Sequence, residues 1–310
     1  MPKVSVIGAG NVGATAVYFI AKQNLADIVM VDVVPGMPQG KALDFLHAGP
    51  MQGYDINILG TNDYADIADS DVVVHTAGIA RKPGMDRMDL LRTNVGIAKV
   101  AGENIKKYAP NAVVVVVANP LDVIAMAMLR ATGFPSERVF GMAGILDSTR
   151  FRYFIAEKLL VLPSDVSAMV LGGHGDTMVP LPRYTTVGGF PLTELLAPDE
   201  IRQLSDRTRT GGGEIVNYLK TGSAYYAPAA SAAQMVQAIL TDRKQIAPCS
   251  AYLTGEYGYK DIFLGVPVML GSKGVERIYE LDLTDDEKAA LDGSVEAVQK
   301  GVRDLDSLSA

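Results

Sequence analysis

One stretch near the start of the chain decides the fold, and it is Val4-Ser5-Val6-Ile7-Gly8-Ala9-Gly10-Asn11-Val12-Gly13. Its apolar beginning predicts a buried strand, and apolar residues at helical spacing beyond the last glycine predict a helix. Gly8 permits the tight turn between them, Gly10 lets the backbone approach a pyrophosphate, and Gly13 lets the helix pack close to the strand. The free N–H groups at the start of such a helix favour phosphate binding.

A second apolar run and an acidic residue complete the pattern. Ile28-Val29-Met30-Val31 predicts another buried strand, and Asp32 stands 19 residues after Gly13. An acid at this distance accepts hydrogen bonds from the adenosine ribose of a dinucleotide. Its negative charge also disfavours a 2′-phosphate, so we predict NAD as the cofactor. The alternative is a glycine turn in an ordinary α/β domain with a surface aspartate. The predicted cofactor-binding residues are Gly8, Ala9, Gly10, Asn11, Val12, Gly13 and Asp32.

Length and composition narrow the class of protein. The 310 residues are 48% hydrophobic and 20% charged, a balance typical of a soluble protein with a sizeable core. The net charge of −7 disfavours nonspecific nucleic-acid binding, and the longest apolar run is too short to span a membrane. One cysteine and three histidines offer neither a disulfide framework nor a metal-ligand cluster. We expect a cytoplasmic protein without a secretory signal.

The order of patterns along the chain predicts a doubly wound α/β fold. Apolar runs at residues 56–60, 71–78, 113–117 and 138–141 alternate with helical patterns, as in a Rossmann-type parallel sheet. The second half predicts a helix over 147–160, a strand over 166–171, and helices over 200–220 and 229–240. Strands over 251–257 and 262–270 then suggest antiparallel pairing. We therefore predict an NAD-binding domain over residues 1–145 and an α+β substrate domain over residues 146–310.

Six polar side chains outside the glycine turn could perform chemistry. Two arginines and an asparagine follow predicted strands, where the carboxyl ends of a parallel sheet form a ligand-binding crevice. An aspartate and an arginine three residues apart share one face of a helix, and a histidine lies in a glycine-rich loop. Each has an ordinary alternative: a charged surface turn, a solvated helix pair or a surface histidine. These candidates are Arg81, Arg87, Asn119, Asp147, Arg150 and His174.

Six motifs in order resemble the lactate and malate dehydrogenase family over essentially the whole length. They are Gly8 to Gly13, Asp32, the loop from Gly78 to Arg92, Ala118-Asn119-Pro120, Leu146-Asp147-Ser148-Thr149-Arg150 and Gly172-Gly173-His174-Gly175-Asp176. The resemblance implies two domains with the NAD site in the first. It also implies an NAD-dependent oxidoreductase that assembles as a homodimer or homotetramer.

The resemblance also implies roles for individual residues. His174 would exchange the proton and Asp147 would be its partner, while Arg150 would bind the substrate carboxylate. Arg87 would polarise the reacting carbonyl. Because such a charge acts strongly only where water is excluded, we also expect the loop around Pro83-Gly84 to close as a lid. The residues implied beside the nicotinamide or the rest of the cofactor are Asn94, Val117 and Asn119.

Arg81 implies the substrate within the family. Lactate enzymes typically carry glutamine at this position and malate enzymes arginine, so this chain resembles the malate branch. The implied reaction is reversible hydride transfer between (S)-malate and NAD, giving oxaloacetate and NADH.

Three alternatives stay open. Lactate, or another 2-hydroxy acid, would leave the Arg81 guanidinium without a partner. An NAD-dependent glycosidase would need a metal site that the histidines and the cysteine do not supply. A non-catalytic NADH-binding protein would not need His174, Asp147 and three arginines.

Overall fold

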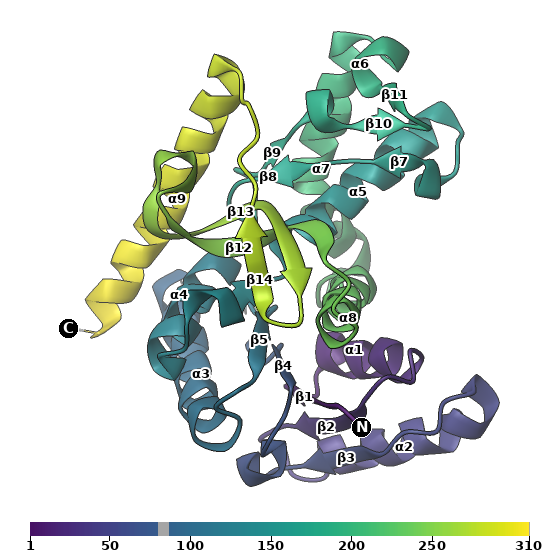
Figure 1. The fold of residues 1–310 in the computed structure, drawn as a ribbon, viewed down its shortest axis with the longest axis vertical. Coiled ribbons are helices and arrows are strands. Elements are labelled where there is room, and N and C mark those ends of the chain that lie inside the picture. The colour runs from purple at the N-terminus through teal and green to yellow at the C-terminus, as the bar shows by residue number, and fades with distance from the viewer. Residues whose placement is uncertain (80–86, 310) are drawn as a thin grey trace.

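The computed structural model describes residues 1–79 and 87–309, with the backbone alone for Arg87 and Ser309. Its main sheet contains parallel strands β1 (Lys3–Ile7), β2 (Asp27–Val31), β3 (Ile58–Thr61), β4 (Val72–His75), β5 (Val113–Val116) and β6 (Val139–Gly141). The same sheet continues with antiparallel strands β12 (Gln245–Thr254), β13 (Lys260–Gly271) and β14 (Gly274–Ile278). The parallel part has the order β3-β2-β1-β4-β5-β6, which is the Rossmann order (Figure 1). The predicted fold class is confirmed.

Helices cover both faces of this sheet. Helices α1 (Asn11–Ala21) and α8 (Tyr226–Leu240) pack against each other on one face, and α3 (Arg87–Tyr108) and α4 (Leu121–Thr132) on the other (Figure 1). Helix α2 (Met37–Gln52) lies along β3 at the sheet edge, and α9 (Asp285–Ser309) packs against α4. Within residues 1–79 and 87–309, no helix combines the length and the apolar composition that crossing a membrane requires.

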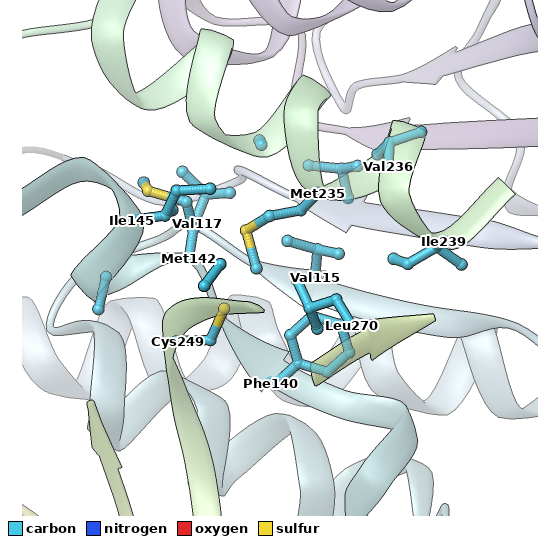
Figure 2. Packing of buried hydrophobic residues seen from close by; sticks show 14 of the residues in the cluster. Val115, Val117, Phe140, Met142, Ile145, Met235, Val236, Ile239, Cys249 and Leu270 are labelled. Carbon is cyan, nitrogen blue, oxygen red and sulfur yellow. The ribbon is translucent and has the colours of Figure 1, made fainter. Parts of the chain in front are cut away.

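The strand of consecutive valines shows why the sheet is covered on both sides. Val113 and Val115 belong to the core beneath α1 and α8, whereas Val114 and Val116 belong to the core beneath α3 and α4. Successive side chains of a strand point to opposite faces, so an uninterrupted apolar run requires two buried faces. Figure 2 shows Met235 of α8 facing Val115 of β5 across the first of these cores.

The second half carries smaller elements beside the main sheet. Helix α5 (Ala143–Leu159) packs against α7 (Pro198–Leu219), and the short helix α6 (Leu192–Leu195) precedes α7. Two small sheets consist of β7 (Val166–Ser167), β10 (Thr186–Val187) and β11 (Phe190–Pro191), and of β8 (Val170–Leu171) and β9 (Val179–Pro180). Short 3-10 helices are η1 (Tyr64–Ile67), η2 (Ser136–Arg138), η3 (Pro163–Asp165), η4 (Pro182–Tyr184) and η5 (Glu256–Gly258).

Two predicted strands differ from the observed ones. The single strand expected over residues 166–171 is two strands, because Val166 pairs with Val187 whereas Val170 pairs with Pro180 in another sheet. The strand expected over 251–257 instead begins at Gln245 and ends at Thr254, before η5. Its antiparallel pairing with the following strand is confirmed.

The T-x-x-E pattern of Thr284 and Glu287 in the sequence predicts the start of the last helix, and the structure confirms it. The Thr284 N–H donates to Glu287 Oε2 over 2.9 Å, and the Glu287 N–H donates to Thr284 Oγ1 over 3.3 Å. This reciprocal pair is a capping box, which satisfies two amides that the helix leaves free.

His75, at the end of β4, is an ionisable side chain inside the core. It is 0% exposed, and within the described residues neither ring nitrogen has a hydrogen-bond partner. Burial lowers the pKa of His75 from its ordinary 6.5 to about 4. The unfolded chain therefore binds one proton more than the folded chain between these two pH values. Stability rises with pH across this window and is lost as the pH falls through it.

We predict that His75→Leu removes part of the acid sensitivity of the fold. Between pH 7.5 and pH 5, the wild type should lose about 2 kcal/mol more free energy of unfolding than the variant, by proton linkage. Urea titrations at the two pH values measure this difference. His47→Leu is the matched control, because this histidine is exposed on the surface of α2. It should retain the wild-type pH dependence of the free energy of unfolding. Equal pH dependence in His75→Leu and the wild type would contradict the prediction.

Candidate active site

The glycine turn joins β1 to α1 as the sequence predicts. Gly8 has a φ of +101°, and a Cβ on Gly13 would lie 1.8 Å from the carbonyl oxygen of Gly8. No residue other than glycine fits this contact between helix and strand. A Cβ on Gly10 would meet nothing within 4 Å, so the space over the turn is open. Helix α1 begins at Asn11 and directs its free amides toward this space.

Asp32 lies directly after β2 and faces the same turn. Its Oδ2 accepts a hydrogen bond from the Ala9 N–H over 2.7 Å, and its Oδ1 accepts one from the Val34 N–H over 3.0 Å. The carboxylate is therefore fixed beside the glycine turn. Open space over Gly10, helix amides and an adjacent acid fit the pyrophosphate and ribose of a dinucleotide.

Asn94 of α3 connects two loops at the carboxyl edge of the sheet. Its Nδ2 donates to the Asn119 carbonyl over 2.8 Å, and its Oδ1 accepts from the Ile79 N–H over 2.8 Å. The side chain is 2% exposed, so both of its polar groups are satisfied within the protein. Asn94 thus fixes the backbone of the residues that follow β4 and β5.

A cavity of about 280 Å³ collects most of the other predicted residues. Val12, Val117 and Asn119 line one side, from the nucleotide-binding half of the chain. Arg150 and His174 line the opposite side, from α5 and from the loop after β8. The cavity therefore lies where the carboxyl ends of the parallel strands meet the second half of the chain, which is the usual ligand position in such folds.

Asp147 joins two ionisable groups of this cavity, His174 and Arg150. His174 Nδ1 lies 2.9 Å from Asp147 Oδ2, and Arg150 Nη1 donates to Asp147 Oδ1 over 3.2 Å. The Asp147 side chain is 3% exposed, whereas those of His174 and Arg150 are each 14% exposed. The carboxylate is buried while the imidazole and the guanidinium reach the cavity.

The pKa of His174 is raised by its acidic neighbours. Burial alone would lower this pKa, but the charge of Asp147 and the hydrogen bond to it outweigh burial. Asp122 raises the pKa further, and Arg150 opposes both carboxylates. His174 therefore holds a proton at higher pH than an ordinary histidine does.

Two of the predicted arginines are not characterised by the structure. Arg81, with the predicted lid at Pro83-Gly84, lies outside the described residues, and the side chain of Arg87 does as well. The backbone of Arg87 begins α3, the helix that also carries Asn94.

Three other residues at or beside the site were not predicted from the sequence. Arg209 of α7 lines the cavity, and its guanidinium donates to the Met178 carbonyl over 3.1 Å and to Asp206 over 2.7 Å. Gly212, on the same helix, lies beside Arg150, whose Nη2 would be in ordinary contact, at 3.6 Å, with a Cβ there. Asp122 contacts the His174 backbone from α4. Only Asp122 has a sequence cue, because it follows Asn119-Pro120 closely.

Family models match both halves of the chain. Residues 2–141 match the NAD-binding domain of lactate/malate dehydrogenases, and residues 145–306 match their α/β C-terminal domain. This chain belongs to the lactate/malate dehydrogenase family. It is therefore an NAD-dependent oxidoreductase, and the open cradle at Gly10 fits that cofactor.

Relatives within the family include enzymes of both kinds. A malate dehydrogenase of Methanosarcina mazei is 56% identical over 99% of this chain and 100% of its own. The apo structure of the Picrophilus torridus malate dehydrogenase is 50% identical, with a TM-score of 0.96 over 99% of this chain and 98% of that one. A Cryptosporidium parvum lactate dehydrogenase, solved with lactic acid and nicotinamide adenine dinucleotide, is 46% identical with a TM-score of 0.95 over 98% of each chain. Since both kinds share this fold closely, the substrate must be decided by individual residues.

The position of Asp32 predicts a strong preference for NADH over NADPH. A 2′-phosphate beside this carboxylate would bring like charges together, which costs several kcal/mol. Asp32→Ser should therefore reduce the ratio of kcat/KM for NADH to kcat/KM for NADPH by about 10-fold or more. Asp27→Ser, at the opposite end of β2, is the matched control and should leave the ratio unchanged. Steady-state kinetics with both cofactors would contradict the prediction if the wild type used them equally well.

Proposed function

We propose that this protein is a malate dehydrogenase that interconverts (S)-malate and oxaloacetate. The observation that carries the proposal is the buried Asp147 carboxylate that bonds both His174 and Arg150 at a cavity beside the dinucleotide cradle. A proton-exchanging group and a carboxylate-binding group are what a 2-hydroxy acid requires. The malate dehydrogenases among the relatives support the choice of substrate.

His174 accepts the C2 hydroxyl proton of malate and returns it to the C2 oxygen of oxaloacetate. Asp147 holds Nδ1 of the ring, so Nε2 is the nitrogen left to face the substrate. The same carboxylate stabilises the imidazolium that forms, as in other carboxylate–histidine pairs. When NAD is bound, its nicotinamide supplies the acceptor for the hydride that leaves C2.

Three arginines divide the remaining charges of the substrate. Arg150 binds the C1 carboxylate through its planar fork, and Arg87 stabilises the charge that develops on the C2 oxygen. Arg81 binds the second carboxylate, at C4, which distinguishes oxaloacetate from pyruvate. Asn119 adds an amide beside the substrate and the nicotinamide.

The residues of the glycine turn, with Asp32, Asn94, Val117 and Asn119, bind the cofactor in this proposal. The chain divides near residue 145 into a nucleotide-binding and a substrate domain, in keeping with family models that end at 141 and begin at 145. Their shared sheet, in which Ser250 of β12 pairs with Gly141 of β6, makes the two domains one packed unit. A homodimer or homotetramer is the expected assembly.

Two other functions are less well supported. A lactate dehydrogenase would share His174, Asp147 and Arg150, but Arg81 would face only the methyl group of pyruvate. A non-catalytic NADH-binding protein would not need the imidazole and the guanidinium exposed to one cavity while their shared carboxylate is buried.

The substrate is tested by comparing oxaloacetate with pyruvate in NADH oxidation. Arg81→Gln should lower kcat/KM for oxaloacetate by roughly 30- to 4,000-fold, since removing one partner of a desolvated charge pair costs about 2–5 kcal/mol. The same change should raise kcat/KM for pyruvate, because an unpaired buried cation is gone.

Arg92→Gln is the matched control, because this side chain is exposed on the surface of α3. It should leave the ratio of kcat/KM for oxaloacetate to kcat/KM for pyruvate unchanged. If Arg81→Gln changes the ratio of these two kcat/KM values by less than about threefold, Arg81 does not bind the C4 carboxylate. A wild type that prefers pyruvate would make the protein a lactate dehydrogenase.

A further inference from the structure

The loop that carries His174 is held from three directions. The Gly172 N–H donates to the Gly265 carbonyl of β13 over 2.9 Å, and the Gly173 N–H donates to Ser294 Oγ of α9 over 2.8 Å. The His174 N–H donates to Asp122 Oδ2 of α4 over 2.9 Å. The first two acceptors are neutral, whereas the third is a carboxyl group.

Asp122 is buried and has two donors. It is 5% exposed, and its second oxygen, Oδ1, accepts from Ser250 Oγ of β12 over 2.6 Å. Burial, with a smaller contribution from the charge of Asp147, raises the pKa of Asp122, and the hydrogen bonds from Ser250 and from the His174 backbone offset a part of that rise. Asp122 also lies in the first turn of α4, where the helix dipole favours a negative charge. Two donors and a helix N-terminus are the surroundings of an ionised carboxylate.

The position of Asp122 links the two halves of the cavity. Asn119 immediately precedes Pro120 and α4, and Asp122 is in the first turn of that helix. The same carboxylate that bonds the His174 backbone is thus fixed to the segment that carries Asn119. A displacement of α4 would therefore move the histidine and the asparagine together.

We propose that Asp122 is a positioning residue that fixes the His174 loop and, through its negative charge, favours the protonated form of the imidazole. This inference rests on the proposed role of His174 in proton exchange. The charged groups that act on His174 are Asp147 and Arg150 from α5 and Asp122 from α4. Asp176 of its own loop and Arg209 of α7 line the same cavity. Asp147 contacts the imidazole ring, whereas Asp122 accepts a hydrogen bond from the His174 backbone N–H, so the two carboxylates act on different parts of the residue.

The pH dependence of both reaction directions separates this role from a merely structural one. Oxaloacetate reduction needs protonated His174 and declines as the pH rises, whereas malate oxidation needs neutral His174 and increases. Asp122→Asn keeps the shape, and its amide can accept from the His174 N–H and donate to Ser250 Oγ. Loss of the charge should move the midpoints of both kcat/KM profiles to lower pH by about half a unit or more. A midpoint, unlike a rate at one pH, does not depend on the fraction of enzyme that is folded.

Ser294→Ala is the matched control because it removes a neutral anchor from the adjacent residue of the same loop. It should lower kcat without moving either midpoint. Ser250→Ala removes one of the two donors that stabilise the ionised form of Asp122, so a part of the Asp122 carboxyl groups becomes protonated and loses its charge. The midpoints of this variant should therefore move in the same direction by a smaller amount. It also serves as the decisive variant if Asp122→Asn does not fold.

Midpoints that stay at the wild-type pH in Asp122→Asn and Ser250→Ala would overturn the proposal. Opposite movements in the two reaction directions would overturn it as well. Failure of the proposed function is a different result, because the wild type itself would then show no oxaloacetate-dependent oxidation of NADH at any pH.

Discussion

A single buried carboxylate, that of Asp147, links the two groups on which the proposed chemistry depends. One of its oxygens lies 2.9 Å from His174 Nδ1 and the other lies 3.2 Å from Arg150 Nη1. A carboxylate this deeply buried is costly unless each oxygen has a partner. The partners in turn are held at the distances that the two bonds impose. The imidazole and the guanidinium therefore face one cavity at a fixed separation before any substrate arrives, as preorganised catalysis requires.

The surrounding fold is arranged so that these bonds can form. Helix α5 presents Asp147 and Arg150 three residues apart, and therefore on one face. The histidine comes from a glycine-rich loop against β13, where a Cβ on Gly265 would lie 2.4 Å from the Gly172 carbonyl oxygen. The parallel strands end beside the same cavity, so Asn119 and the glycine turn reach it from the other half of the chain. The long sheet that crosses both halves keeps these contributions in register.

The local features of this arrangement could be predicted from sequence because each depends on neighbouring residues. The glycine turn, the strand of consecutive valines, the capping box at Thr284 and the spacing of Asp147 and Arg150 are of this kind. The contacts of Asp122 could not be predicted, because its partners His174 and Ser250 lie 52 and 128 residues away. The division of residues 166–171 between two sheets was also hidden, since a strand pattern does not specify its pairing partner. The resemblance implies that Asn94 lies near the cofactor, but the use of both its polar groups for backbone contacts depends on tertiary structure and could not be predicted.

The central claim, that Asp147 controls the proton on His174, is tested most directly by NMR titration of ¹³C-labelled histidine. His174→Asn assigns the resonance, and the wild-type pKa should lie above the ordinary 6.5. In Asp147→Asn the pKa of His174 should fall by about one unit or more, because both the charge and the charged hydrogen-bond acceptor are lost. Asp176→Asn, in the same loop, is the matched control and should leave the titration near that of the wild type. A His174 pKa below 6.5 in the wild type, or one that is unchanged in Asp147→Asn, would contradict this account of the site.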